Sequence, residues 1–393
     1  MKINKNKLSR LQELLLEMTR SGYVSGASCL VIQGSEEQCY YEAGLRDIAS
    51  GLPMTRDTLF RLYSMSKPVT AVAAMILLEE GRIDLADPVC DYLPSFCSQQ
   101  VMVNDVLVPA RRQTTIQDLL NMTSGLTYPG ESCAAQVRTA LLMDEVIEKL
   151  STPQALTTRE ITDRLGQIPL AFHPGEKWHY GMSADVLGAV IEVVSGMRFG
   201  DFLKERIFVP LGMKDTGFYV PADKQYRLAK VYQAGTDGLL EAPYPHLGIS
   251  NSMKTPPAFE SGGAGLVSTI DDYARFTQML LHQGTWENRR ILAPRTVTFL
   301  SQAHLDPSFD PYVRQWESLA GCSYGNLMRN MIDPGQAITL CSPGEYGWDG
   351  WLGVYMTIDP ADDLTFLYMQ QKTDTGTTAY TRRLRNVVFS ALE

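Results

Sequence analysis

The sequence predicts an α/β protein of the α+β type, in which both ends of the chain build one antiparallel sheet and the middle folds into a mostly helical lobe. The chain begins with a helical pattern followed by two strand patterns, and it ends with two strand patterns followed by a helical one. With 393 residues it can bury one large core or two closely packed lobes. We therefore expect a single unit, 1–393, with an α/β lobe at about 1–60 plus 318–393 and a mostly helical lobe at about 61–317.

The first element is an amphipathic helix, because apolar residues from Leu8 to Met18 recur at helical spacing over residues 7–20. Residues 27–34 and 38–45 then alternate like strands around a short polar turn, which predicts a hairpin.

The last elements mirror the first. Residues 353–360 and 364–371 predict a second hairpin around a Pro-Ala-Asp-Asp turn, and residues 377–393 predict a final helix. Between the two ends, helical patterns broken by Pro and Gly turns cover 69–80, 115–122, 184–195 and 271–282.

Composition narrows the function classes. A net charge of −9 and a pI near 5.2 exclude a nucleic-acid partner, because such partners need a clustered basic face. No apolar run reaches the roughly 18 residues of a membrane helix, and the charged start does not resemble a secretory signal, so we expect a cytoplasmic protein. Seven scattered cysteines without a Cys-x-x-Cys pair fit free thiols, and we expect neither a metal nor a cofactor.

The segment FRLYSMSK, residues 60–67, places polar groups at the start of an apolar, buried helix. If the helix begins at Ser64, the side chains of Ser64 and Lys67 share one face, and Gly81 ends the helix. The N–H groups and dipole at a helix start favour a developing oxyanion, and a lysine there can take up the hydroxyl proton. The structural alternative is that Ser64 only caps the helix while Lys67 extends to the surface.

Seven segments in order make the pattern specific: FRLYSMSK, LLEEGRIDLADPVCDYLPSF, TTIQDLLNMTSGL, PGEKWHYGMSADVLGAVIEVVSG, PLGMKDTGF, SGGAGLVSTIDDYARF and GWDGWLGVYMTIDP. From about residue 7 to the C-terminus the chain resembles the beta-lactamase-related serine hydrolases, which group class C beta-lactamases, penicillin-binding DD-peptidases and family VIII esterases. The resemblance implies a beta-lactamase/transpeptidase-like fold and acyl-transfer chemistry on a serine. The pattern is most similar to that of family VIII carboxylesterases.

By this resemblance, the nucleophile motif falls on Ser64 and Lys67, and the tyrosine of the second motif on Tyr180. The family mechanism implies that Tyr180 takes the Ser64 proton while the Lys67 ammonium lowers the pKa of the phenol. It also implies an oxyanion hole made of the backbone N–H groups of Ser64 and Trp351, with Gly350 letting the strand approach the substrate.

Two motif positions depart from the family pattern. Met182 replaces an asparagine whose carboxamide could recognise an amide, and Trp348 replaces a lysine that could hold a carboxylate. Both changes disfavour lactam and peptide substrates and fit a more apolar acyl or alcohol pocket. Strand alternation turns Asp349 away from the Trp348 face, which leaves its role open. Taken singly, Tyr180, Trp348 and Trp351 are equally compatible with packing aromatics.

Three other patterns are judged to be non-catalytic. GCSYG, residues 321–325, fits the nucleophile elbow of α/β-hydrolases, but every histidine precedes Ser323, so the required chain order fails and we expect a turn before a strand. Tyr324 to Asn326 fits Tyr-x-Asn but lacks a following capped helix, whereas the helix after Tyr180 is expected to be capped by Ser183. The glycine-rich residues 261–266 need only be a tight turn.

The sequence thus favours a serine hydrolase that cleaves small carboxylic esters through a Ser64 acyl-enzyme, with Lys67 and Tyr180 as proton-transfer partners. The alternatives are a beta-lactamase, a D-amino-acid peptidase or amidase, an acyltransferase of the same fold, and a penicillin- or ligand-binding relative without turnover. The expected partner is a small-molecule ester or amide. The natural substrate and the oligomeric state stay open.

Overall fold

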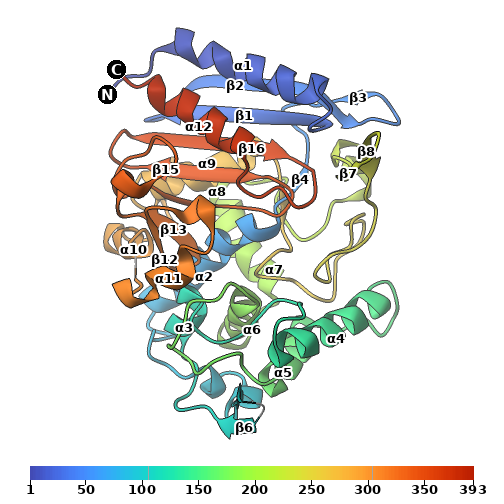
Figure 1. Ribbon diagram of the computed structural model, residues 1–393, viewed down its shortest axis with the longest axis vertical. Coiled ribbons are helices and arrows are strands. Elements are labelled where there is room, and N and C mark those ends of the chain that lie inside the picture. Colours follow the sequence, from blue (N-terminus) through green and yellow to red (C-terminus); the bar gives the residue numbers. More distant parts are fainter. Residues whose placement is uncertain (105, 303) are drawn as a thin grey trace.

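The computed structural model describes residues 1–104, 106–302 and 304–393, and its centre is an antiparallel sheet of eight strands (Figure 1). The strand order is β12-β13-β14-β15-β16-β1-β2-β3, so the first hairpin lies beside the last one, and Ala27 pairs with Gln370. The strands are β1 (Gly26–Gln33), β2 (Glu36–Asp47), β3 (Leu52–Pro53), β12 (Cys322–Gly325), β13 (Met328–Met331), β14 (Tyr346–Asp349), β15 (Tyr355–Asp359) and β16 (Leu364–Gln370). The predicted sheet built from both termini is confirmed.

The two terminal helices, α1 (Lys5–Arg20) and α12 (Ala379–Ser390), cover one face of this sheet and pack against each other (Figure 1). Apolar side chains of α1, such as Leu8 and Leu15, are fully buried there, which explains the spacing seen in the sequence. The other face is covered by α9 (Ile270–Leu281), where Gln278 donates a hydrogen bond of 2.9 Å to Thr365 on β16. A helix from the range predicted for the helical lobe therefore packs on the sheet, and the lobe limits stay a prediction.

The helix α2 (Ser66–Glu79) lies in the core, and its residues from Ser66 to Leu77 are all buried. The remaining helices are α3 (Ile116–Asn121), α4 (Ala134–Lys149), α5 (Thr158–Gln167), α6 (Ser183–Ser195), α7 (Phe199–Leu203), α8 (Val209–Leu211), α10 (Pro294–Leu300) and α11 (Asp310–Val313). Among these, α2 packs against α6, α7 and α10. Four short strand pairs complete the fold: β4 (Phe60–Arg61) with β9 (Val267–Ser268), β5 (Gln100–Val103) with β6 (Val106–Pro109), β7 (Tyr232–Gly235) with β8 (Gly238–Glu241), and β10 (Thr285–Trp286) with β11 (Arg289–Arg290). Within the described ranges, no helix combines the length and apolar character needed to cross a membrane.

Candidate active site

Ser64 and Lys67 meet at the start of α2. The helix begins two residues later than predicted, and Ser64 lies in a single 3-10 turn, Tyr63–Met65, directly before it. Ser64 remains partly exposed, whereas Lys67 has no solvent-accessible surface. The Lys67 ammonium donates to Ser64 Oγ at 3.2 Å. Lys67 therefore does not extend to the surface, and its amine lies against the proposed nucleophile.

Burial makes the Lys67 ammonium more acidic than that of an exposed lysine. Desolvation lowers its pKa to about 7, while Asp185 and Asp349 act in the opposite direction by favouring the charged form. An amine with this pKa is largely neutral slightly above pH 7, and a neutral amine has a free lone pair. Lys67 can consequently accept the proton of Ser64 at physiological pH.

Tyr180 reaches the same place from the loop before α6. Its hydroxyl accepts a hydrogen bond of 2.9 Å from Trp348 Nε1, and the Lys67 ammonium lies 4.5 Å from the centre of its ring. Burial raises the pKa of Tyr180, and the neighbouring Ser64 hydroxyl and Trp348 indole only partly oppose this. The expected lowering of this pKa is wrong, because the loss of solvation on burial outweighs the groups that favour the phenolate. Tyr180 is therefore a proton donor in the resting protein.

A second tyrosine, Tyr128, was not predicted from the sequence. Its hydroxyl lies 2.8 Å from Lys67 Nζ, and its ring centre lies 5.6 Å from that of Tyr180. Burial raises its pKa far above the ordinary value, so it also stays protonated near neutral pH. Tyr128 follows two residues after the segment TTIQDLLNMTSGL, but nothing in its local pattern indicates proximity to Lys67.

The glycine-rich residues 261–266 hold Lys67 from the other direction. The carbonyl of Gly263 accepts a hydrogen bond of 2.9 Å from Lys67 Nζ. Asp185 on α6 fixes this turn by accepting from the Ser261 hydroxyl and, at 3.1 Å, from the Gly263 N–H. The expected tight turn is present, and in addition it positions the lysine.

The end of β14 closes the site beside Ser64. Trp348 is buried, and a Cβ atom on Gly350 would lie 2.2 Å from the Leu62 carbonyl oxygen. Gly350 is thus required by the close approach of the chain after β14 to the segment before Ser64, and its role toward a substrate stays a prediction. Asp349 accepts a hydrogen bond from the Thr377 hydroxyl just ahead of α12, which gives the role that the sequence left open.

Trp351 follows Gly350 and lines the neighbouring surface. Its ring stacks on His246 with 4.0 Å between centroids and lies 5.0 Å from the ring of Tyr63. Its indole N–H donates to Asp374 at 2.7 Å. Within the described residues, its backbone N–H donates to no protein group, so this N–H is available to a ligand.

Met182 contributes no polar side-chain group to the cluster around Ser64 and Lys67. Its side chain is buried in the core, and its backbone carbonyl accepts from the N–H of Asp185 at the start of α6. Ser183 does not cap α6 as predicted, because its hydroxyl pairs with Ser124 at 2.8 Å instead.

Aromatic side chains form a wall next to Tyr180. This aromatic wall consists of five side chains whose neighbouring ring centroids lie 5.1 to 6.4 Å apart: Trp178, Tyr180, Trp316, Tyr324 and Trp348. Tyr324 belongs to β12, and so does Ser323, which is buried and far from the arrangement of a nucleophile elbow. Only Gly321 of the segment 321–325 lies in the predicted turn, because Cys322–Gly325 already form the strand β12 and have a packing role.

The described residues contain no group of three or more His, Cys, Asp or Glu side chains placed to hold a metal ion. The arrangement instead provides a partly exposed hydroxyl, a buried amine and two protonated phenols. Together with the fold, it defines a serine hydrolase. Residues 11–388 match the family model described as Beta-lactamase, and the chain belongs to this family.

Similar proteins cover almost the whole chain. Protein Rv1367c of Mycobacterium tuberculosis is 36% identical over 375 residues, which span 92% of this chain and 89% of that protein. Esterase EstB of Burkholderia gladioli is 30% identical over 399 residues, with 97% and 95% covered.

Solved structures of similar fold also cover almost the whole chain. EstCE1, described as a hydrolase with promiscuous acyltransferase activity, has a TM-score of 0.83 at 25% identity and covers 98% of this chain and 99% of its own. Unliganded LovD from Aspergillus terreus, at 22% identity and a TM-score of 0.80 with 98% of each chain covered, shares the fold. Relatives within the family thus include esterases, acyltransferases and penicillin-binding proteins.

Proposed function

We propose that this protein hydrolyses small carboxylic esters through an acyl-enzyme on Ser64. The observation that carries the proposal is the buried Lys67, whose pKa of about 7 and hydrogen bond of 3.2 Å to Ser64 Oγ suit it to deprotonate the hydroxyl.

The proposed reaction has two halves. In the first, Lys67 accepts the Ser64 proton as Oγ attacks the ester carbonyl, and the N–H groups of Ser64 and Trp351 hold the oxyanion. The proton then passes from Lys67 through the hydroxyl of Tyr180 to the departing alkoxide, which leaves as the alcohol. In the second half, water attacks the acyl-enzyme and gives up its proton by the same route, which releases the carboxylic acid and restores Ser64.

The surroundings of Ser64 support esters over lactams and peptides. Trp348 occupies the position of a lysine that could hold a substrate carboxylate, and its indole N–H is already engaged by Tyr180. The aromatic wall offers stacking and apolar contact but no cation for an anionic substrate. The activity in the names of EstB and EstCE1 agrees with this choice.

Acyl transfer to an alcohol is the second candidate. The same acyl-enzyme serves both reactions, and the exposed Trp316, which stacks on the buried Trp348, offers an apolar surface on which an alcohol competes with water. The acyltransferase name of a relative that is 25% identical, CalJ of Penicillium decumbens, is consistent with this branch. Product analysis with and without added alcohol separates the two.

A cytoplasmic site of action stays a prediction. It is supported by the seven cysteines, all of which are free thiols in the structure.

The deciding experiment compares Ser64→Ala with Ser323→Ala, the serine of the GCSYG segment, using a short-chain p-nitrophenyl ester. We expect Ser64→Ala to lower kcat by at least about 10³-fold, because the nucleophile is lost, and Ser323→Ala to retain activity within about threefold. Retained activity in Ser64→Ala would refute the assignment. Lasting acylation of the wild type without turnover, detected by intact mass, would favour the non-turnover binding alternative.

A further inference from the structure

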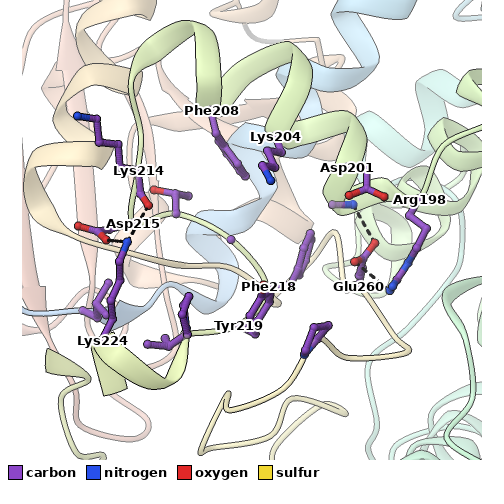
Figure 2. Close-up of a pocket in the computed structure, with 17 residues that line it drawn as sticks. Arg198, Asp201, Lys204, Phe208, Lys214, Asp215, Phe218, Tyr219, Lys224 and Glu260 are labelled. Carbon is purple, nitrogen blue, oxygen red and sulfur yellow. Dashed lines mark hydrogen bonds and ion pairs between the residues drawn. The ribbon is translucent and has the colours of Figure 1, made fainter. Parts of the chain in front are cut away.

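A cavity lies away from Ser64, and nothing in the proposed reaction uses it. It has a volume of about 390 Å³ and lies between α7, the π-helical turn Lys204–Phe208 and the loop 214–221, with Pro256 and Glu260 at its edge (Figure 2). This volume falls within the range of small-molecule sites. Neither Ser64 nor Lys67 lines it.

The floor of the cavity is apolar. Phe208, Phe218 and Val220 are buried side chains that line it, together with Leu59. Phe218 packs so closely on the turn 261–266 that a Cβ atom on Gly265 would lie 2.7 Å from its ring. The cavity therefore lies against the turn that holds Lys67.

The charges around the rim are mostly satisfied within the protein. Glu260 pairs with Arg198 at 3.0 Å and accepts from the N–H of Gly200 at 2.8 Å. Asp215 pairs with Lys224 at 2.6 Å and with Arg227 at 2.7 Å. These two carboxylates are therefore paired, whereas the third carboxylate of the lining, Asp201, is exposed and forms no ion pair within the described residues.

Lys204 is different. Like Lys214, it forms no ion pair with any carboxylate in the described part of the chain, but Figure 2 shows its ammonium directed toward the middle of the cavity, next to Phe208, whereas the Lys214 ammonium points away. A cation above an apolar floor is a complementary surface for an anion with a hydrophobic body.

We propose that this cavity is a second binding site, which takes a small organic anion with a flat or aliphatic body. Lys204 contacts the anionic group, while Phe208 and Phe218 contact the body. Carboxylates of this kind have the chemistry of an ester hydrolysis product, but the site itself does not depend on catalysis by Ser64.

Gly217 provides a direct way to fill the cavity. It lines the space, its φ lies outside the left-handed region, and the nearest atom to an added Cβ is the Tyr219 carbonyl oxygen at 4.0 Å. Its N–H and carbonyl pair with the backbone of Val267, which a side chain does not disturb. Gly217→Leu should therefore fold and block the site.

The test measures binding of 2-naphthoate by fluorescence and ligand-observed NMR, without any substrate. We expect a Kd on the order of 0.1 to 1 mM for the wild type, as suits a ligand with about 13 heavy atoms. Binding should weaken roughly 3- to 10-fold in Lys204→Ala, further in Lys204→Glu, and disappear in Gly217→Leu. Lys254→Ala, which removes an exposed cation outside the cavity, should bind like the wild type.

Absence of wild-type binding would overturn the proposal, and so would undiminished binding in both Gly217→Leu and Lys204→Glu, since the ligand would then occupy another place. If Lys254→Ala lost as much affinity for 2-naphthoate as Lys204→Ala, the loss would reflect the overall charge of the protein, and this result would also refute the proposed site. Ser64→Ala must keep its affinity, which separates this result from the outcome for the proposed ester hydrolysis.

Discussion

Lys67 shows how a single residue acquires its function from its surroundings. Its side chain is enclosed on all sides and bonded to Ser64 Oγ, the Tyr128 hydroxyl and the Gly263 carbonyl. Enclosure removes water from the ammonium and lowers its pKa to about 7, so a residue that is a surface cation elsewhere is suited here to the proposed role of a base.

The first residue-scale prediction concerns pH. Because Lys67 must be neutral to accept the Ser64 proton, kcat/KM should rise tenfold per pH unit below pH 7 and level off above about pH 8. Initial rates on a short-chain ester between pH 5.5 and 9 measure this. A flat profile across that range would exclude Lys67 as the base.

The second residue-scale prediction separates the two tyrosines. Tyr180→Phe removes a protonated hydroxyl that relays the proton to the leaving group, and kcat should fall roughly 10²- to 10⁴-fold. Tyr128→Phe removes one hydrogen bond to Lys67 and should cost about 10-fold or less.

Acylation and turnover of the two variants are compared with an activated and an unactivated ester. The Tyr180→Phe defect should be smaller for p-nitrophenolate, which needs little protonation. An equal defect with both leaving groups would argue against a relay through Tyr180.

At the scale of elements, α6 and the turn 261–266 together position Lys67 at the start of α2. Asp185 on α6 accepts two hydrogen bonds from the turn, and the turn then presents its Gly263 carbonyl to Lys67. The carboxylate is fully buried, so its charge acts on the lysine with little screening by solvent.

This support predicts the effect of Asp185→Asn. The carboxylate raises the pKa of Lys67, so its replacement by a neutral amide should lower that pKa and move the ascending limb of the pH–rate profile to lower pH. Ser261→Ala is the matched control, because it removes a hydrogen bond from the same turn without changing charge. A shift of equal size in both variants would show that geometry, rather than charge, is responsible.

At the scale of the whole molecule, the C-terminal helix is fastened to the sheet by a buried ion pair. Arg385 on α12 contacts Glu345 beside β14 at 2.5 Å, and both side chains are almost completely buried. Arg329 lies 3.8 Å from the same carboxylate. Since β14 leads directly to Trp348 and Gly350, this pair connects the chain terminus to the strand that closes the site.

Removing Arg385 from this buried ion pair should strongly destabilise the protein. Arg385→Met leaves Glu345 buried with only the more distant Arg329, and the free energy of unfolding should fall by about 3 to 5 kcal/mol. Arg382→Ala, which breaks a partly exposed pair with Glu317, should cost less than about 1 kcal/mol. Urea unfolding followed by circular dichroism measures both, and similar losses would refute a special role for the buried pair.

Sequence reasoning went furthest where local chemistry decides the outcome. Period and turn residues predicted α1, the first and last hairpins and α12 to within a few residues, because amphipathic spacing reports which face is buried. Gly81 ends α2 in a left-handed conformation with φ of 65°, as predicted. The ordered motifs also brought Ser64, Lys67, Tyr180 and Trp348 into one candidate site before any geometry was known.

By itself, then, the sequence determined the α+β architecture, the family and the identity of the proposed nucleophile, since these depend on periodicity and on motif order. Only the tertiary structure decided the acidity of Lys67 and Tyr180, because burial is a property of the assembled core and not of a local segment. The same holds for Tyr128, which lies 61 positions from Lys67 in the chain yet contacts it in space.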